Sequence, residues 1–191
     1  MTTVSLRPIK EWNREAVEAL RVSPAQEQFV NNVTESLIEE REEPGARGRF
    51  WAVYADETPV GFVMISDGAE GPEYLPHYLW KLLIDESYQR QGFGTATLNL
   101  IVEYFRQRPG VEVLWTSANQ GEGSPIPFYE RYGFEQTGDI VFNNEVLLRL
   151  RLSQQLGLAD SNSPLFFQCG YRSNASAILL AMSTALSAPS C

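Results

Sequence analysis

The chain has 191 residues, of which 43% are hydrophobic, 20% charged and 12% aromatic, and its formal net charge is −9. These proportions are those of a globular chain and argue against disorder over most of the length. The acidic balance argues against nucleic acid as a partner, because phosphate binding requires clustered Lys and Arg.

The first third of the chain predicts one strand and two helices. Thr3 to Pro8 alternates weakly and is typical of a short strand. Glu11 to Leu20 has helical spacing, and Ser23-Pro24 then resembles an N-cap followed by proline at the first helical position, which predicts a second helix running to about Glu43. The residues expected on the buried sides are Trp12, Ala16, Ala19 and Leu20 in the first helix and Phe29, Val30, Val33, Leu37 and Ile38 in the second.

Three strands and one helix are expected in the middle of the chain. Arg49–Tyr54 and Val60–Ser66 are apolar, β-branched or aromatic runs, and the turn residues between them predict a hairpin. A polar loop over residues 67–76 precedes a strand candidate at His77–Asp85. That strand leads into a turn with glycines and then into a helix over Thr95–Gln107.

The remaining pattern completes one domain. Val111–Ser117 is typical of a strand, Ser124-Pro125 opens a short helix that Gly133 closes, and Phe142–Leu152 alternates as a last strand. This order predicts an α/β (α+β) domain over residues 1–152, a mixed central sheet flanked by helices on both faces. Residues 153–191 are poor in charge and rich in Ser, Ala and Leu, which is typical of a poorly ordered tail. A docked helix or a partner-binding segment is the alternative.

Cysteine and histidine are scarce. The chain has Cys169, Cys191 and a single histidine, His77, so neither a disulfide framework nor a metal site is expected. The N-terminus lacks the basic-then-apolar pattern of a signal peptide, and no run reaches the roughly 20 apolar residues of a membrane span. We therefore expect a cytoplasmic protein with no membrane partner.

The most specific motif is Gln89-Arg90-Gln91-Gly92-Phe93-Gly94, between a predicted strand and a predicted helix. Backbone amides in the first turn of a helix lack intrahelical partners and lie at the positive end of the helix dipole, so they attract anions. Glycines allow close approach of the anion, and Thr95 and Thr97 are expected to add hydroxyl donors. A Gly-x-Gly pair also occurs in plain turns, but the flanking pattern favours a pyrophosphate site, without the features of a dinucleotide fingerprint or a Walker A loop.

The pattern Gln/Arg-x-x-Gly-x-Gly/Ala between a strand and a helix resembles the acetyl-CoA pyrophosphate signature of the GNAT superfamily of N-acetyltransferases. A second segment, with Phe128-Tyr129 and Gly133-Phe134, is similar to the family pattern Phe-Tyr-x-x-x-Gly-Phe. Glu122 and Pro125 stand where that pattern has Asn and Ala, which is a departure. The resemblance covers about residues 3–152 and implies the GNAT fold, with acetyl-CoA as co-substrate.

The resemblance also implies which residues meet the co-substrate. Tyr129 matches the tyrosine that protonates the departing CoA thiolate, and expulsion of a thiolate requires such a donor; simple packing of the helix is the alternative. Backbone groups at Leu83 and Ile84 are implied to hold the pantetheine and to supply an oxyanion donor. The implied cofactor-binding residues are Leu83, Ile84, Gln89, Arg90, Gln91, Gly92, Phe93, Gly94, Thr95, Ala96 and Thr97.

Within the family, Gln26–Val30 and Tyr78–Lys81 look like the bacterial spermine/spermidine acetyltransferase branch. The expected acceptor is therefore a small cationic amine, a polyamine first, admitted by an acidic pocket. Glu27, His77 and Tyr78 are placed around this acceptor.

An amine must lose a proton before it attacks a thioester, so the reaction needs a base. Glu145, Glu27 and His77 are the candidates, although each residue type is also common in solvated or structural positions. Tyr129 and Glu145 are assigned the catalytic roles. Direct attack in a ternary complex is expected, because the predicted domain holds no cysteine to carry the acyl group.

Other functions stay open at this point. The acceptor could be an aminoglycoside, an amino acid or a protein N-terminus. The departures at Glu122 and Pro125 suggest a non-catalytic acyl-CoA-binding module, and the segment 153–191 suggests an interaction protein. Family resemblance is also compatible with a homodimer.

Overall fold

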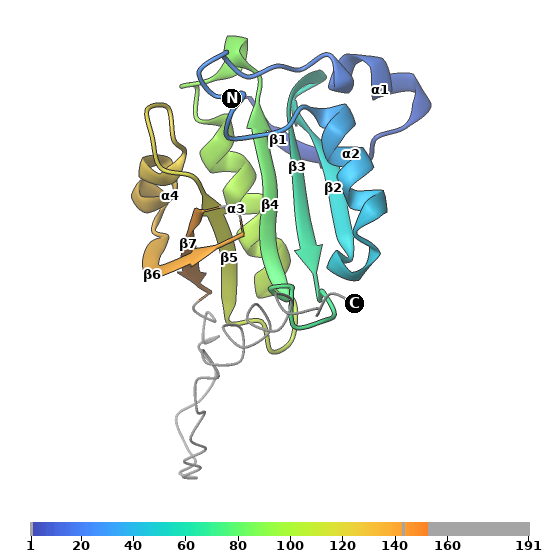
Figure 1. The fold of residues 1–191 in the computed structure, drawn as a ribbon. Helices are drawn as coiled ribbons and strands as arrows, with labels where there is room; N and C mark the ends of the chain where they lie inside the picture. Colours follow the sequence, from blue (N-terminus) through green and yellow to red (C-terminus); the bar gives the residue numbers. More distant parts are fainter. Residues whose placement is uncertain (1, 143, 153–191) are drawn as a thin grey trace, which may run out of the picture. The chain divides into compact units, whose positions relative to one another are not determined.

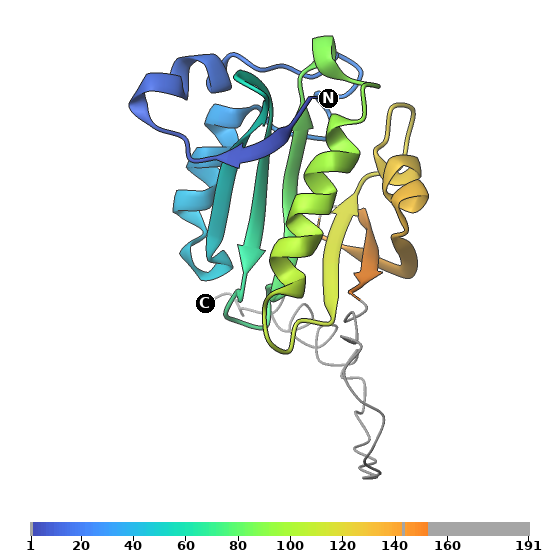
Figure 2. The ribbon, with the colours of Figure 1, turned by 180° about the vertical axis from the view of Figure 1, so that it is seen from behind.

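The computed structural model describes residues 2–142 and 144–152, which form a seven-stranded sheet with helices on both faces (Figures 1 and 2). The strands are β1 (Val4–Arg7), β2 (Gly48–Ala55), β3 (Thr58–Asp67), β4 (His77–Ile84), β5 (Val113–Ala118), β6 (Glu135–Val141) and β7 (Glu145–Arg151). The helices are α1 (Glu11–Glu18), α2 (Val33–Glu42), α3 (Phe93–Arg106) and α4 (Ile126–Tyr132), with short 3-10 turns η1 (Pro44–Ala46) and η2 (Glu86–Tyr88). The predicted α/β class is confirmed. The expected tail, with Cys169 and Cys191, lies outside the described residues.

The strands are ordered β1-β2-β3-β4-β5-β7-β6. Strands β1 to β4 pair antiparallel, β4 pairs parallel with β5, and β5, β7 and β6 are again antiparallel. The interior strand β3 is buried without interruption over residues 60–66. A strand covered on both faces needs such a continuous apolar run rather than alternation.

Each face of the sheet has its own apolar cluster. Helix α3, which Figure 2 shows in front of the sheet, presents Leu98, Ile101 and Phe105 to one face. Helices α1 and α2 cover the other face, with Val17, Val33 and Leu37 in its cluster (Figure 1). No helix within the described residues combines the length and the apolar character that crossing a bilayer requires.

The predicted second helix begins later than expected. Residues 24–29 form turns, and α2 starts at Val33 behind the N-cap Asn32. The Asn32 side chain accepts from the Glu35 amide at 2.9 Å, and the Glu35 carboxylate accepts from the Asn32 amide at 3.3 Å. This capping box defines the helix start more strongly than Ser23-Pro24 does.

The buried side of α1 was predicted only in part, because Leu20 is buried just after the helix as expected but Ala16 and Ala19 are exposed. Trp12 is 70% exposed, whereas Asn13 is buried among apolar neighbours. Asn13 is accommodated because its side chain donates to Pro8 O and Tyr54 Oη and accepts from the Lys10 amide. A satisfied polar group can be buried at little cost, and an apolar-spacing analysis does not detect it. Ile38 of α2, also expected in the core, is exposed.

Strand β6 was not predicted. Its residues Glu135–Val141 are mostly exposed, it lies at the sheet edge, and its pairing with β7 is irregular between Gln136 and Ile140. An edge strand that is open to solvent carries little of the apolar alternation used to recognise strands. The last strand is correspondingly shorter than expected, Glu145–Arg151.

Candidate functional site

Strands β4 and β5 diverge and leave a cleft between them. They share a single register pair, Tyr78 with Trp115, supported by a 3.0 Å hydrogen bond from Thr116 Oγ1 to Leu79 O. Parallel neighbours normally continue their evenly spaced hydrogen bonds along the shared length. Here the ends of both strands instead line a cleft of about 540 Å³ that also contacts the N-terminus of α3 and α4.

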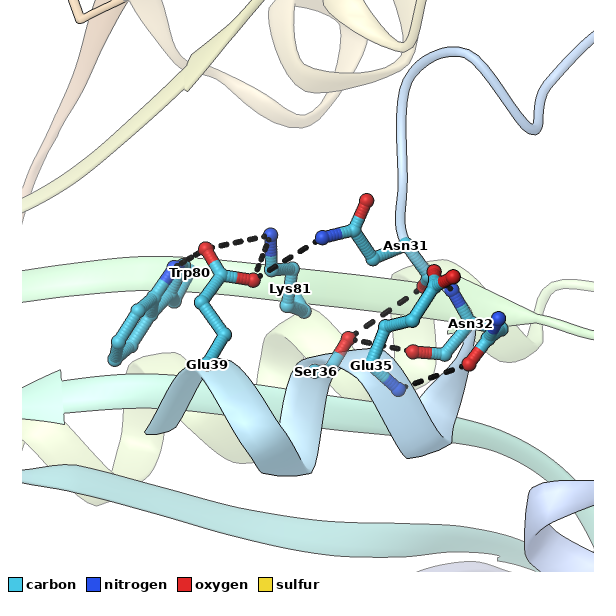
Figure 3. A network of polar contacts seen from close by, with 7 residues as sticks. All are labelled: Asn31, Asn32, Glu35, Ser36, Glu39, Trp80 and Lys81. Atoms are coloured by element: carbon cyan, nitrogen blue, oxygen red, sulfur yellow. Dashed lines mark hydrogen bonds and ion pairs between the residues drawn. The ribbon is translucent and has the colours of Figure 1, made fainter. Parts of the chain in front are cut away.

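A bulge in β4 contributes to this divergence. Met64 pairs with Lys81 and Ile65 with Leu79, so Trp80 is an extra residue in β4. A bulge bends its strand and redirects side chains. As a result the consecutive residues Trp80 and Lys81, which would face opposite sides of a regular strand, both reach the Glu39 carboxylate on α2 (Figure 3).

Glu39 ties α2 and the loop before it to the cleft wall (Figure 3). Its carboxylate accepts from Trp80 Nε1 at 3.2 Å and from Asn31 Nδ2 at 3.2 Å, and it lies 2.9 Å from Lys81 Nζ. Trp80 and Lys81 line the cleft. The network therefore fixes one side of the cleft and neutralises the charge of a lysine in its wall.

Replacing Glu39 by Gln is expected to lower the free energy of unfolding by about 1–3 kcal/mol, because the Lys81 ammonium then stays in the wall without its anion. The Lys81 side chain is only 15% exposed, so water compensates poorly for the loss. Urea denaturation measures the change. Glu18→Gln is the matched control: Glu18 pairs with Arg14 on one helix, and the expected loss is below about 0.5 kcal/mol. Equal losses in the two variants would contradict the role of the network.

The N-terminus of α3 forms one end of the cleft. Ala96 donates the first intrahelical bond, to Gly92 O at 3.0 Å, so the amides of residues 92–95 have no partner within the helix. Gly92 has φ +87° as the N-cap, which favours glycine. A β-carbon at Gly94 would lie 3.2 Å from Phe128 Cζ, so a larger residue would crowd the cleft at this turn.

Two arginines add positive charge at this end. Arg90 and Arg131 both line the cleft, and neither forms an ion pair with another side chain in the described part of the chain. Unpaired guanidinium groups beside a helix N-terminus favour phosphate oxygens. The extended cleft, its helix terminus and its arginines fit a long ligand that bears phosphate groups, such as acetyl-CoA.

Most of the residues implied to bind cofactor line the cleft, namely Ile84, Gln89, Arg90, Gly92, Phe93, Gly94 and Thr95. Gln89 also holds the loop, because its Nε2 donates to Ile84 O and to Gln26 Oε1, each at 2.9 Å. The remaining residues, Leu83, Gln91, Ala96 and Thr97, are not in the lining.

Thr97 does not present its hydroxyl to the cleft. It is fully buried, and its Oγ1 donates to Phe93 O at 2.8 Å within the helix. The Ala96 amide is used by the helix, and the Gln91 side chain donates back to Ser87 O. The expected hydroxyl donor at Thr97 was therefore wrong, since one helical turn beyond the terminus a side chain faces the core.

The backbone of β4 faces the cleft at Leu82 and Ile84 rather than at Leu83. Asp85 N donates to Val60 O, so the backbone groups of Asp85 point toward β3. Backbone groups in an antiparallel pair alternate in direction, so those of Leu83, opposite Phe62, also point toward β3. Leu82 and Ile84 have groups on the open side, and both line the cleft.

Tyr129 of α4 is a buried phenol in the cleft wall. Burial raises the pKa of Tyr129 to about 12, and the nearby Thr116 hydroxyl opposes part of that shift. The phenol therefore keeps its proton at neutral pH. A protonated, water-shielded hydroxyl in the wall can donate a proton to a group that develops negative charge.

Tyr78 and Glu145 are brought together by Ser117, which sequence analysis did not single out. Ser117 Oγ on β5 lies 2.5 Å from Tyr78 Oη on β4 and donates to Glu145 Oε2 on β7. Ser117 lines the cleft, whereas Tyr78 and Glu145 do not. A lone serine in a strand has no signature in the sequence, and only the pairing of β5 with β7, Ser117 opposite Leu147, brings it near Glu145.

His77 and Glu27, both expected around the acceptor, lie outside the cleft lining. His77, at the start of β4, packs against Phe105 of α3, and burial lowers the pKa of its imidazole. Glu27 is exposed on the turns that replace the predicted helix, and Gln26 lines the cleft beside it.

The cleft wall is not acidic in itself. No Asp or Glu of the described residues is part of the lining, which includes the cations Lys81, Arg90 and Arg131. Carboxylates lie one contact behind it, Glu39 at Lys81 and Glu145 at Ser117. Over the same described residues, no three His, Cys, Asp or Glu side chains gather as metal ligands.

Comparison with known proteins gives a family and a fold. The model of the acetyltransferase (GNAT) family matches residues 8–134. The chain is similar to the spermine/spermidine N(1)-acetyltransferase of Bacillus subtilis, with 24% identity over 153 residues, which is 76% of this chain and 97% of the relative.

Solved structures show the same fold at low identity. An acetyltransferase from Thermus thermophilus gives a TM-score of 0.60 at 19% identity and covers 78% of this chain and 97% of its own. Spermidine N-acetyltransferase from Vibrio cholerae, solved with CoA and spermine, gives 0.58 at 14% identity and covers 79% of this chain and 96% of its own.

Proposed function

The chain belongs to the GNAT family of acetyl-CoA-dependent N-acetyltransferases, and from this premise we propose that it acetylates a primary amine of a polyamine. The observation that carries the proposal is the cleft between β4 and β5, which has a helix N-terminus at one end and Tyr129 and Ser117 in its wall. Each part has a chemical task in moving an acetyl group from sulfur to nitrogen.

We place the pyrophosphate of acetyl-CoA at the N-terminus of α3, against the free amides of residues 92–95. Arg90 and Arg131 would neutralise its phosphate charges. The backbone of Leu82 and Ile84 would hold the pantetheine along the open edge of β4, where Ile84 O is already engaged by Gln89. Bound there, acetyl-CoA supplies an activated acyl group.

Tyr129 is proposed as the general acid. Its proton is retained at neutral pH because burial raises the pKa of the phenol to about 12. As the bond between carbonyl carbon and sulfur breaks, Tyr129 gives this proton to the sulfur, so that no buried thiolate accumulates.

The acceptor is proposed to be a polyamine, such as spermine or spermidine. Similarity to the Bacillus subtilis spermine/spermidine enzyme supports this choice. The net charge of −9 would also attract a polycation more strongly than a monocation.

An amine panel tests the acceptor. With thiol release as the readout, kcat/KM for spermine and spermidine is expected to exceed that for butylamine at least about tenfold, because the acidic protein attracts a polycation more strongly than a monocation. The advantage should shrink as the salt concentration rises, since screening weakens charge attraction.

Other outcomes of the panel have distinct meanings. Equal kcat/KM for butylamine and spermine, or preference for an amino acid, an aminoglycoside or a peptide N-terminus, would replace the polyamine with another acceptor. CoA binding by calorimetry together with no turnover of any amine would identify an acyl-CoA-binding module instead.

A further inference from the structure

Three polar side chains from three strands form a series of hydrogen bonds beside the cleft. Tyr78 comes from β4, Ser117 from β5 and Glu145 from β7. Tyr78 Oη and Ser117 Oγ are 2.5 Å apart, and Ser117 donates to Glu145 Oε2. Ser117 is the member that lines the cleft. The Glu145 carboxylate is therefore connected to the cleft by a hydrogen bond through the Ser117 hydroxyl.

The hydrogen-bonding capacity of Ser117 determines which group donates in each of these hydrogen bonds. A hydroxyl has one proton to donate and two lone pairs that accept. Because the proton of Ser117 is given to Glu145, the Tyr78 hydroxyl must be the donor to Ser117 Oγ. One lone pair of Ser117 remains, on a side chain in the cleft lining, and it can accept a hydrogen bond from an ammonium group.

We propose that Ser117 receives the first proton of the acceptor ammonium and passes its own proton to Glu145, with Tyr78 as a positioning residue that orients the serine hydroxyl. This relay rests on the proposed function, because it serves the attack of an amine on acetyl-CoA. It makes Glu145 the base without contact between Glu145 and the amine.

The other titratable groups near Glu145 cannot take this role. Burial, together with the negative charge of Glu145, raises the pKa of the phenols of Tyr78 on β4 and Tyr129 on α4. Both phenols therefore keep their protons at neutral pH. Glu145 is the carboxylate of this group and the member that can bind a proton there.

The protons balance as follows. The acceptor ammonium loses two protons overall. Glu145 takes the first through Ser117 and later releases it to solvent. As the bond from nitrogen to the acetyl carbon forms and the bond from that carbon to sulfur breaks, Tyr129 gives its proton to sulfur. The second nitrogen proton restores Tyr129, and the products are the acetylated amine, CoA with a free thiol, and one released proton.

The relay predicts a specific pH signature. A primary amine with a pKa of about 10.4 is neutral in only about one molecule in 2,500 at pH 7, and that fraction rises tenfold per pH unit. Wild type can use the abundant ammonium form, so its kcat/KM should change little between pH 7 and pH 9. Glu145→Gln can use only the neutral form of the amine. Its kcat/KM should therefore be about 100-fold below that of wild type at pH 7 and should rise nearly tenfold per pH unit.

Three further variants sharpen the experiment. Ser117→Ala should show the same pH slope as Glu145→Gln, because it interrupts the same path. Tyr78→Phe should lose less than about tenfold in kcat and keep the wild-type dependence of kcat/KM on pH, because it removes only the hydrogen bond that orients the Ser117 hydroxyl. Glu135→Gln is the matched control: this exposed carboxylate on β6 pairs with Arg149 at 3.5 Å, and its removal should leave both level and slope unchanged.

The outcomes separate the relay from the proposed function. The relay alone is overturned if Glu145→Gln or Ser117→Ala has the same kcat/KM and the same pH dependence as wild type, while Tyr129→Phe still lowers turnover. Wild-type protein that binds CoA but acetylates no amine at any pH overturns the proposed function and the relay with it. Melting temperatures of all variants identify a loss of activity that is due to unfolding.

Discussion

Tyr129→Phe is expected to lower kcat by about 100-fold to 1,000-fold with saturating spermidine, while the KM for acetyl-CoA changes less than about twofold. The variant keeps the aromatic ring in the cleft wall and removes only the proton donor. Without it, a thiolate must leave into a buried wall, which is costly. Steady-state kinetics with thiol detection separate the two parameters.

The fold should tolerate this change. The Thr116 hydroxyl, which influences the Tyr129 phenol, already donates to Leu79 O at 3.0 Å, so removing the phenol leaves the Thr116 proton with its acceptor. Tyr132→Phe is the matched control on the same helix, because the Tyr132 hydroxyl bonds Asn99 at 2.9 Å in a solvent-exposed position. A kcat loss of similar size in both variants, or none in Tyr129→Phe, would remove Tyr129 as the acid.

The second large effect is expected at Gly94. Gly94→Val should weaken CoA binding at least about 100-fold, equal to about 2.7 kcal/mol. A β-carbon there would already lie 3.2 Å from Phe128 Cζ and 3.8 Å from Ile84 Cγ1, and the valine methyl groups would occupy the space over the free amides of α3. Calorimetric titration with CoA measures the dissociation constant.

Graded controls isolate the steric cause. Gly94→Ala should lose less affinity than Gly94→Val, because it adds a single methyl group. Glu103→Val places the same β-branched residue in the same helix at an exposed position, and affinity should stay within about twofold of wild type. Unchanged CoA affinity in Gly94→Val would mean that the cofactor does not approach this turn.

Much of the fold could be predicted because its signals are local. The strand, glycine turn and helix from His77 to Arg106 are recognisable from apolar runs and a phosphate-loop motif, and the structure has β4 and α3 there. Strand β6 and the start of α2 escaped prediction. Strand β6 is exposed at the edge of the sheet and so lacks an apolar pattern. The start of α2 is set by a capping box, whereas the earlier Ser23-Pro24 pair had indicated an earlier start.

The site was predictable only where side chains carry a motif. Gly92, Gly94 and Tyr129 lie on the cleft as their motifs indicate. Ser117 and Trp80 could not be found, because their positions depend on the pairing of β5 with β7 and on a bulge in β4. His77 was chosen for its residue type and Glu27 for a residue type within a segment that resembles the polyamine branch, and titratable residues are common in ordinary surface and core positions.

The single register pair between β4 and β5 has a consequence for the lifetime of the protein. The part of the sheet that ends at β4 and the part that begins at β5 share few backbone hydrogen bonds. A pantetheine arm bound between the two strands would add hydrogen bonds that link these parts. Ligand that binds only the folded chain adds about 2.7 kcal/mol at 100 times its dissociation constant. Resistance to proteolysis would then follow the supply of acetyl-CoA, and starvation for acetyl groups would shorten the survival of the enzyme that consumes them.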